Sequence, residues 1–447
     1  MLVSRASRAA VFAAGAALLL ATSACGSDQP ESATQTQVRL YGTDANMMNS
    51  YAGELKDRAS LINGMTGTSP MMPLSASFKE RLASVDPKLG DYTYAPETYD
   101  AVVISALAAQ LAGTTDPTAI AKQIIGVTND GERCEDPAAC LGLARQGLDI
   151  EYRGVSLTRS GFTDAGEPST ASYATLHFDH EKLNDGKTEF VGAGDESAAS
   201  TRTPPKAKKQ RAGEKAHDAP LVVGGLLPKT GDLALAYPPM AAAATLAIKE
   251  INAAGGVLGK PVVWIDGDDG TNPDVAKATV ASHVRHGVHV IIGAGASGIT
   301  RAVLPDVVAA GRVLFSPSNT DAGLTTADDH GLYFRTAPPD TLQGRALADV
   351  ILRDGPHKIA IVARKDSYGE GLQEKVRAEL ERVGFDGDRV KLLSYLPPAD
   401  ADAPPVDFSE AAREIKDFNA DAALIIGFSE SAAVITALAD AGVQLRH

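Results

Sequence analysis

From Leu221 to the end of the chain, short apolar runs alternate with longer runs whose apolar residues recur at helical spacing. The apolar runs predict strands, and their sequences are LVVGGLL, PVVWIDG, VHVIIG, VLFSPS, KIAIVAR, VKLLSYL and AALIIGF. Such runs are typical of parallel strands that are buried on both faces. Regular alternation of strand and helix predicts an α/β fold with doubly wound layers. The segment Arg335 to Asp340, which contains two prolines, interrupts this alternation and predicts a crossing between two lobes.

The N-terminal half supplies elements that the C-terminal half lacks. QVRLYG predicts a strand, one helix is expected to begin near Pro96, and another to run from Asp116 to Ile125. The last predicted helix ends at AGVQLRH, with a glycine but no strand after it. Joining His447 to Gln37 would give the order helix, loop, strand without a break.

Composition divides the chain into segments with different expected roles. Residues 191–220 are rich in Ala, Gly, Ser, Thr, Pro and Lys and have no apolar periodicity, which predicts a disordered linker. The expected segments are a lipoprotein signal peptide (1–24), a polar tether (25–37), a second half of the fold with parts of both lobes (38–190), the linker (191–220), the main part of the first lobe (221–338) and the main part of the second lobe (339–447).

The extreme N-terminus predicts export. Arg5 and Arg8 precede an apolar run from Ala9 to Ala21 and then TSAC, which is the order of a secretory signal. The run is shorter than the roughly 20 residues that a membrane-spanning helix needs. The pattern resembles the bacterial lipoprotein cleavage box, with Cys25 as the lipidated first residue, although Thr22 stands where that box usually has Leu. The alternative is ordinary secretion with Cys25 removed or unmodified.

The net charge and the composition limit the kinds of partner that the protein can bind. A net charge of -14 argues against nucleic acid and against an anionic membrane surface. The 44% of hydrophobic residues and the 25 prolines suit a globular exported protein.

Cys134 and Cys140 lie close together in the polar loop GERCEDPAACLG. Outside the cytoplasm two such thiols are expected to oxidise, so we predict a local disulfide with a structural role.

Several motif-like patterns lack a part that their chemistry requires. Gly293 to Gly298 matches G-x-G-x-x-G, but it follows a third strand, and the next strand ends without a ribose-binding acid. GASGI lacks the closing glycine of a nucleophile elbow, and GGVLGKP lacks the spacing of a P-loop. His283, His286 and His289 are expected to be surface residues of a helix rather than zinc ligands. We therefore expect no enzyme activity, no cofactor and no metal.

Many segments together resemble the branched-chain amino-acid type of ABC-transporter substrate-binding protein, a type I periplasmic binding protein. The resembling segments are LLPKTGD, INAAGGVLGKPV, DDGTNP, GASGIT, FSPSNTDAGLT, YFRTAPPD, DSYGEG, LYGTDANMM, YAPETYDAV and SGFTDAGEPSTASY. The resemblance implies two lobes with a hinge, in the Venus-flytrap manner. The family has the two halves in the opposite order, which predicts a circularly permuted chain whose linker joins the old ends. The rival explanation is two half-domains that pair with other chains.

The resemblance also implies a ligand site on the first lobe. In the family, hydroxyls and backbone groups of two loops hold the ligand's carboxylate and amine, and these loops correspond to Ser297 and to Ser318 with Thr320. A helix N-terminus at Ser297 suits a carboxylate. The alternatives are a simple helix cap at Ser297 and an ordinary polar turn at the second loop. Tyr237 is expected either to line the side-chain pocket or to pack.

The second lobe is expected to provide an acid and aromatic rings. The family places an acid against the ligand ammonium where this chain has Asp44, because a carboxylate there accepts a charge-assisted hydrogen bond. The alternative is an exposed loop aspartate. Tyr368 matches the family's aromatic residue opposite the ligand, and Phe428 falls where some members have Tyr.

These residues lead to two hypotheses about function. The first is an extracytoplasmic binding component of an ABC importer, anchored by lipidated Cys25 to the outer face of the cell membrane. It would deliver a small zwitterionic ligand, a branched-chain or other amino acid or an amide, to ABC permease subunits. The second is a ligand-sensing or scaffold lipoprotein with the same fold and no transporter.

Overall fold

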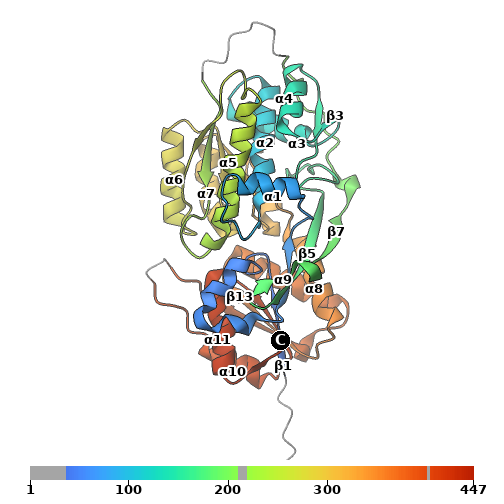
Figure 1. The fold of residues 1–447 in the computed structure, drawn as a ribbon, viewed down its shortest axis with the longest axis vertical. Helices are drawn as coiled ribbons and strands as arrows, with labels where there is room; N and C mark the ends of the chain where they lie inside the picture. Colours follow the sequence, from blue (N-terminus) through green and yellow to red (C-terminus); the bar gives the residue numbers. More distant parts are fainter. Residues whose placement is uncertain (1–36, 210–218, 400–402) are drawn as a thin grey trace, which may run out of the picture. The chain divides into compact units, whose positions relative to one another are not determined.

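The computed structural model describes residues 37–209, 219–399 and 403–447. The predicted signal peptide, the lipidation site Cys25 and almost all of the tether lie outside the described residues. Within the described part, none of the helices has the length and apolar character needed to cross a bilayer. Two main sheets, each covered by helices, organise the fold, and a separate pair of short strands completes it (Figure 1).

The first lobe is built around a sheet of parallel strands in the order β12-β11-β10-β8-β9. These strands are β8 (Val222–Leu226), β9 (Val263–Ile265), β10 (Val290–Gly293), β11 (Val313–Ser316) and β12 (Tyr333–Arg335). The connecting helices are α5 (Tyr237–Ala253), α6 (Pro273–Arg285) and α7 (Ser297–Ala309). The strand–helix alternation predicted for this region is therefore confirmed.

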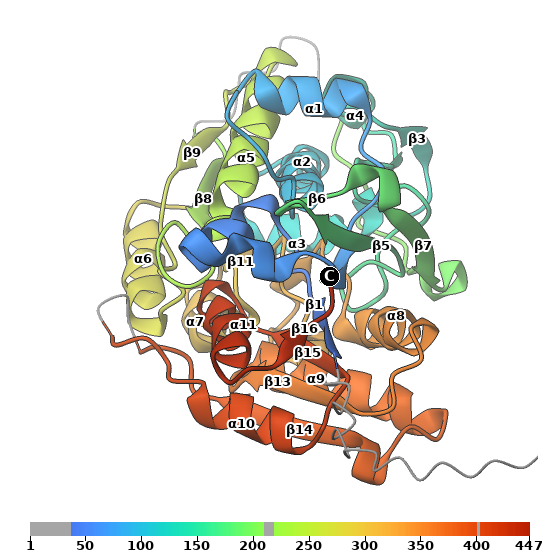
Figure 2. The same ribbon diagram turned by 60° about the horizontal axis from the view of Figure 1, so that its bottom comes forward.

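The N-terminal half of the chain covers this first sheet. Its helices are α1 (Ala76–Ala83), α2 (Ala95–Ala112), α3 (Pro117–Val127) and α4 (Pro137–Arg145), with the paired strands β3 (Glu132–Cys134) and β4 (Ile150–Tyr152). Helix α2 is buried at every residue and packs against α5, β10 and β11, while α6 and α7 pack together on the other side of the sheet (Figures 1 and 2). Because a helix buried all round needs neighbours on every side, α2 holds the centre of this lobe.

The second lobe is built around a nine-stranded sheet with the main order β14-β13-β15-β1-β2-β5-β6. Its strands are β1 (Gln37–Gly42), β2 (Thr66–Pro70), β5 (Thr170–Asp179), β6 (Lys182–Leu183), β7 (Glu189–Gly194), β13 (Ile359–Arg364), β14 (Val390–Tyr395), β15 (Ala422–Ile426) and β16 (Gln444–Leu445). Its helices are α8 (Asp340–Arg353), α9 (Ser367–Arg382), α10 (Ser409–Asp417) and α11 (Ala432–Asp440), with the 3-10 helix η1 (Asn49–Ile62).

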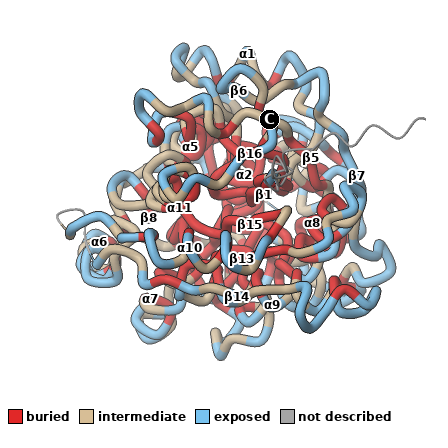
Figure 3. The backbone as a smooth tube through the Cα atoms, turned by 90° about the horizontal axis from the view of Figure 1, so that it is seen from below, coloured by how far each residue is buried: buried red, intermediate tan, exposed pale blue. Residues whose placement is uncertain are grey.

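Strand β1 lies between β15 and β2, so residues from the two ends of the chain share one sheet. Strand β15, which pairs with β1, and strand β13, which pairs with β15, are buried at every residue, and exposed residues lie on the helices outside them (Figure 3). The structure differs from the expectation that no strand follows the last helix. Strand β16 pairs in parallel with β1, and the main-chain N–H of Arg446 donates to the carbonyl of Val38 at 2.9 Å.

Part of the predicted linker is ordered. Residues 191–194 belong to β7, which pairs antiparallel with β5, and the main-chain N–H of Lys208 donates to Leu111 at 2.9 Å. Pro204 packs against Gly126, where an added Cβ would lie 2.4 Å from the proline ring. An edge strand of small residues is held by backbone hydrogen bonds, which leave no apolar periodicity in the sequence. Residues 210–218 of the predicted linker lie outside the described residues.

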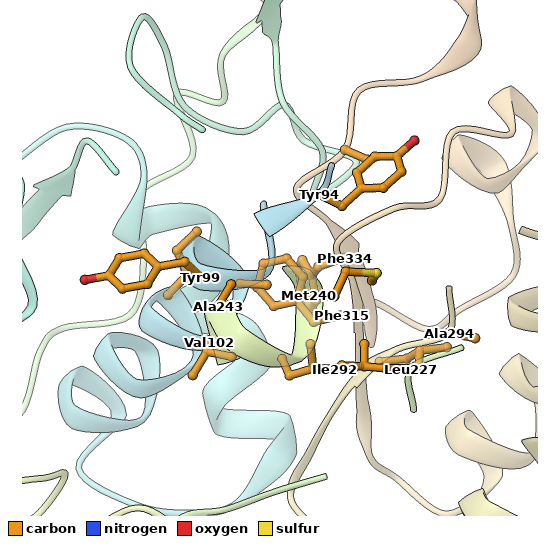
Figure 4. Packing of buried hydrophobic residues seen from close by; sticks show 14 of the residues in the cluster. Tyr94, Tyr99, Val102, Leu227, Met240, Ala243, Ile292, Ala294, Phe315 and Phe334 are labelled. Atoms are coloured by element: carbon orange, nitrogen blue, oxygen red, sulfur yellow. The ribbon is translucent and has the colours of Figure 1, made fainter. Parts of the chain in front are cut away.

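The core of the first lobe joins both halves of the chain. Val102 of α2 lies with Met240 of α5 and Ile292 of β10 in one buried cluster (Figure 4). Phe315 contacts Phe334 with ring centroids 5.8 Å apart. Since α2 comes from the N-terminal half and the other residues from the C-terminal half, neither half alone can close this core.

Cys134 and Cys140 form the predicted disulfide between β3 and α4. The two cysteines are six positions apart, so the closed loop is short and the chain-entropy estimate of its stabilisation is only about 2 kcal/mol. Replacing both cysteines by serine is expected to lower the free energy of unfolding by about that amount, measured by urea denaturation. A reducing agent should lower the stability of the native protein equally and leave the double variant unchanged. Equal stability of the two proteins under oxidising conditions would contradict this prediction.

Candidate functional site

The loop after β10 presents Ser297 at the start of α7. Ser297 is buried, and its Oγ accepts the main-chain N–H of Asp321 at 3.2 Å. It does not cap α7, because Ala296 occupies the cap position and makes no side-chain cap hydrogen bond. The loop itself is held by Asp269, which accepts the main-chain N–H of Gly295 at 2.7 Å. Burial raises the pKa of Asp269 to about 7.

The loop after β11 lies directly beside the Ser297 loop. Ser318 Oγ donates to the carbonyl of Gly295 at 2.8 Å, so this hydroxyl ties the two loops together. Asn319 also donates to the same carbonyl, at 3.0 Å. Thr320 Oγ1, in contrast, is buried beside the carboxyl group of Asp340, and no other hydrogen-bond partner of this hydroxyl is present among the described residues. The Thr320 hydroxyl therefore remains able to bind a polar group that enters between the lobes.

Asp44 follows β1 of the second lobe and is only 3% exposed. Its carboxylate accepts the hydroxyl of Tyr94 at 2.5 Å, the amide of Gln343 at 2.7 Å and the hydroxyl of Tyr368 at 3.0 Å. Burial raises the pKa of Asp44, and these hydrogen bonds only partly oppose it. The structure therefore contradicts the alternative that Asp44 is an exposed loop residue. All three donors are neutral.

Asp340 begins α8, where the chain crosses from the first lobe to the second. Its main-chain N–H donates to the carbonyl of Thr320 at 2.7 Å, but both carboxylate oxygens are buried without a hydrogen-bond partner. Burial, followed by the charge of nearby Asp44, raises the pKa of Asp340 well above its usual range. Two neighbouring buried carboxylates are costly unless a cation or several donors join them. This arrangement suits a positively charged group.

Two aromatic rings form a wall beside the carboxylates. Tyr368 and Phe428 stack with centroids 5.5 Å apart and an angle of 26° between their planes. The Tyr368 hydroxyl also lies 2.8 Å from the hydroxyl of Thr43. On the other ring, the guanidinium of Arg364 lies 3.8 Å from the Phe428 centroid. The wall therefore presents one polar edge, the hydroxyl of Tyr368.

The structure brings six of the seven expected binding residues into one connected cluster. Asp44, Tyr368 and Phe428 lie on the second lobe, and Ser297, Ser318 and Thr320 on the first, with Asp340 between the two groups. Tyr237 is different. It is the first residue of α5, it is half-buried, and the Lys229 ammonium lies 6.0 Å from its ring centroid.

Three residues of this cluster, Tyr94, Gln343 and Asp340, were not expected from the sequence. The sequence offered one local signal for Tyr94, which is its position before the proline-containing start of α2. The structure adds that Tyr94 has a φ of 58°, which is unusual for a tyrosine. Asp340 ends the segment with two prolines that predicted the crossing between lobes. Gln343 carried no signal, because its partner Asp44 is 299 positions away.

One expectation about histidines is wrong. His283 is buried, and its Nε2 lies 2.7 Å from the carbonyl of Gly225. It fits there because Gly224 and Gly267 lack side chains, and an added Cβ at either would lie within 3 Å of the imidazole. Burial lowers the pKa of His283. Across the described residues, no group of three His, Cys, Asp or Glu side chains is arranged to hold a metal ion.

Comparisons with known proteins show which family the chain belongs to. A family model described as periplasmic binding protein matches residues 220–447, half of the chain. The Leu/Ile/Val-binding protein homolog 3 of Brucella melitensis is 26% identical over 228 residues, which cover 51% of this chain and 60% of that protein. The leucine-specific-binding protein of Salmonella typhimurium is 35% identical over 147 residues, 32% of this chain and 40% of that protein.

Among solved structures, a periplasmic binding protein type 1 from Bordetella pertussis is 22% identical, with a TM-score of 0.45, over 51% of this chain and 61% of that chain. The chain spans about half the length of the curated relatives it matches. The family model and the two sheets flanked by helices confirm the predicted fold class. The chain belongs to the periplasmic binding protein family.

Proposed function

We propose that this protein is the extracytoplasmic solute-binding component of an ABC importer and that it holds a small zwitterionic amino acid between its lobes. Membership of the family implies a location outside the cytoplasm. The observation that carries the proposal is the pair of buried carboxylates, Asp44 and Asp340, with no cation among their hydrogen-bond partners in the described residues. A ligand ammonium would supply the missing positive charge.

The proposed ligand spans both lobes. Its ammonium lies between Asp44 and Asp340 and donates to the free hydroxyl oxygen of Thr320. Its carboxylate lies at the start of α7, where the Ser297 hydroxyl and the first main-chain N–H groups of the helix face it, because a helix N-terminus favours an anion. The side chain lies against Tyr368 and Phe428. In this pose each ligand charge that loses water gains a partner from the protein.

The proposal is tested by thermal denaturation of the purified protein with a panel of single amino acids, their amides and urea. A ligand that binds only the folded state stabilises it by about 2.7 kcal/mol at a hundred times its Kd. We expect zwitterionic amino acids to raise the Tm by several degrees and the matching acids without the amino group to leave it unchanged. Equal shifts from both sets would contradict the proposed use of the two carboxylates.

A sensing or scaffold lipoprotein remains the second candidate, because the same cleft serves it without a permease. The genes beside this one distinguish the two, since permease and ATPase genes favour import. The lipid anchor at Cys25 belongs to both candidates.

We also propose that the chain is a circular permutant which forms one cleft in one molecule. The proposal is supported by the position of β1 between β15 and β2 and by α2 in the core of the first lobe. The molar mass measured by light scattering is expected to be that of one chain. A dimer in which halves are exchanged would contradict it.

A further inference from the structure

Beside the ligand cluster, on the far side of Phe428 and Arg364, the first lobe touches the second at Asp232. This residue lies in the turn between β8 and α5. Its main-chain carbonyl accepts the N–H of Ser429 at 3.1 Å, in the 3-10 helix η7 (Ser429–Ser431) that follows β15. Its carboxylate oxygen lies 3.7 Å from a guanidinium nitrogen of Arg364, at the end of β13. One first-lobe residue thus contacts two second-lobe segments.

Arg364 already has two carboxylate partners within the second lobe. Its Nε donates to Asp366 at 2.5 Å and its Nη1 to Glu430 at 2.7 Å, and its side chain is 5% exposed. The hydroxyl of Tyr395 adds a further hydrogen bond to Glu430 at 2.6 Å. The single guanidinium is therefore neutralised before the lobes meet.

Closing the cleft adds a third carboxylate to this group. Asp232 is 21% exposed, so it is partly removed from water as well as brought near two like charges, Asp366 and Glu430. Like charges in a partly buried place disfavour ionisation of the last group to arrive. The open state has no such cost, because there Asp232 would face solvent.

We propose that closure of the cleft takes up a proton at Asp232, so that the closed state which holds the ligand is favoured as the medium acidifies. This regulation rests on the proposed function in one respect: the closed state is the state that binds the amino acid. It gives an exported binding protein a response to external pH at a residue that does not contact the ligand in the proposed pose.

The sign follows from the environment of Asp232. Burial, followed by the charge of Glu430, raises the pKa of Asp232 to about 6 in the closed state, with Arg364 lowering it and Asp366 raising it by smaller amounts. An exposed aspartate has a pKa of about 3.9. The closed state therefore binds this proton more tightly, and its advantage grows as the pH falls through 6. Linkage of these two pKa values gives about a tenfold increase in the closed-to-open ratio between pH 7 and pH 5.

The test measures the distance between the lobes in the ligand-free protein, so it does not depend on the ligand's identity. Spin labels are attached at Val275→Cys on α6 and Val383→Cys after α9, two exposed positions, in a Cys25→Ser background. Double electron–electron resonance then gives the closed-to-open ratio at pH 7 and pH 5. We expect the ratio to rise about tenfold on acidification, from the linkage above.

Asp232→Asn separates this residue from the other buried acids that titrate. The variant resembles the protonated side chain, so its closed-to-open ratio at pH 7 should already exceed that of the native protein. Between pH 7 and pH 5 the variant should lose the factor of about ten by which the native ratio rises. The matched control Asp306→Asn, at an exposed position of α7, should behave as the native protein.

Three results would overturn the proposal: no change of the native ratio with pH, the same change in Asp232→Asn, or an opening of Asp232→Asn at pH 7. The last result would make Asp232 an attractive ion-pair latch. A separate measurement with leucine added tests the proposed function. If the closed-to-open ratio changes with pH but not with leucine, the proton linkage at Asp232 stands and only leucine as the ligand is rejected.

Discussion

Replacing Asp44 with alanine is expected to weaken amino-acid binding by roughly a hundredfold, or about 3 kcal/mol. The carboxylate of Asp44 lies in the second lobe, where it accepts hydrogen bonds from Tyr94, Gln343 and Tyr368. In the proposed pose it also neutralises the ligand ammonium. Truncation leaves that charge buried beside Asp340 alone, whose pKa is already raised well above its usual range. Isothermal titration calorimetry with leucine measures the change.

Two further variants make this prediction specific. Asp44→Asn keeps the size of the side chain and one acceptor oxygen, which can serve Gln343 and Tyr368, while its NH2 group replaces the oxygen that accepts from Tyr94. It removes the charge, so it should lose most of the same affinity. Tyr237→Phe is the matched control, because Tyr237 lies beside Lys229 and should change the Kd by less than about twofold. Unchanged affinity in Asp44→Ala would remove Asp44 from the site.

Glu167→Ala is expected to lower the free energy of unfolding by about 3–5 kcal/mol, because it leaves a buried guanidinium without its counter-charge. Arg335 is completely buried, and it donates from Nε at 2.9 Å and from Nη2 at 2.5 Å to the same oxygen of Glu167. Its remaining nitrogen donates to the carbonyls of Asn319 and Asp321, at 3.2 and 2.8 Å. This ion pair therefore supports the loop that carries Thr320. Urea denaturation monitored by circular dichroism gives the value.

An exposed ion pair provides the control for this variant. Glu374 pairs with Arg377 on the surface of α9, where its side chain is 55% exposed. Glu374→Ala should cost no more than about 1 kcal/mol, because water and salt screen such pairs. If Glu167→Ala costs as little as Glu374→Ala, the buried pair is not the support that its geometry indicates.

The sequence was sufficient to predict most of the fold and six residues of the candidate site. Apolar runs such as KIAIVAR mark strands that are buried on both faces, and their periodicity does not depend on distant partners. The expected loops with Ser297 and Thr320 follow strand ends, where parallel sheets present their ligand sites. The family resemblance added Asp44 and Tyr368 as candidates, and the structure places these two side chains in hydrogen-bond contact.

The residues that were missed depend on contacts between distant parts of the chain. Gln343 lies inside an ordinary helix and gains a role only because α8 meets the loop after β1. Asp340 could be placed at a crossing between lobes, but its lack of a partner is visible only in three dimensions. The order of residues 191–194 was missed for a related reason, since backbone pairing with β5 leaves no side-chain pattern.

The central claim is that residues from both ends of the chain hold one amino acid in one cleft. A crystal structure of the purified protein, grown with the amino acid that raises its Tm most, tests this claim directly. We predict density for the ligand with its ammonium in hydrogen-bond contact with Asp44 and Asp340 and its carboxylate at Ser297 in the same molecule. A ligand bound elsewhere, or a cleft that joins Asp44 of one chain to Ser297 of another, would contradict it.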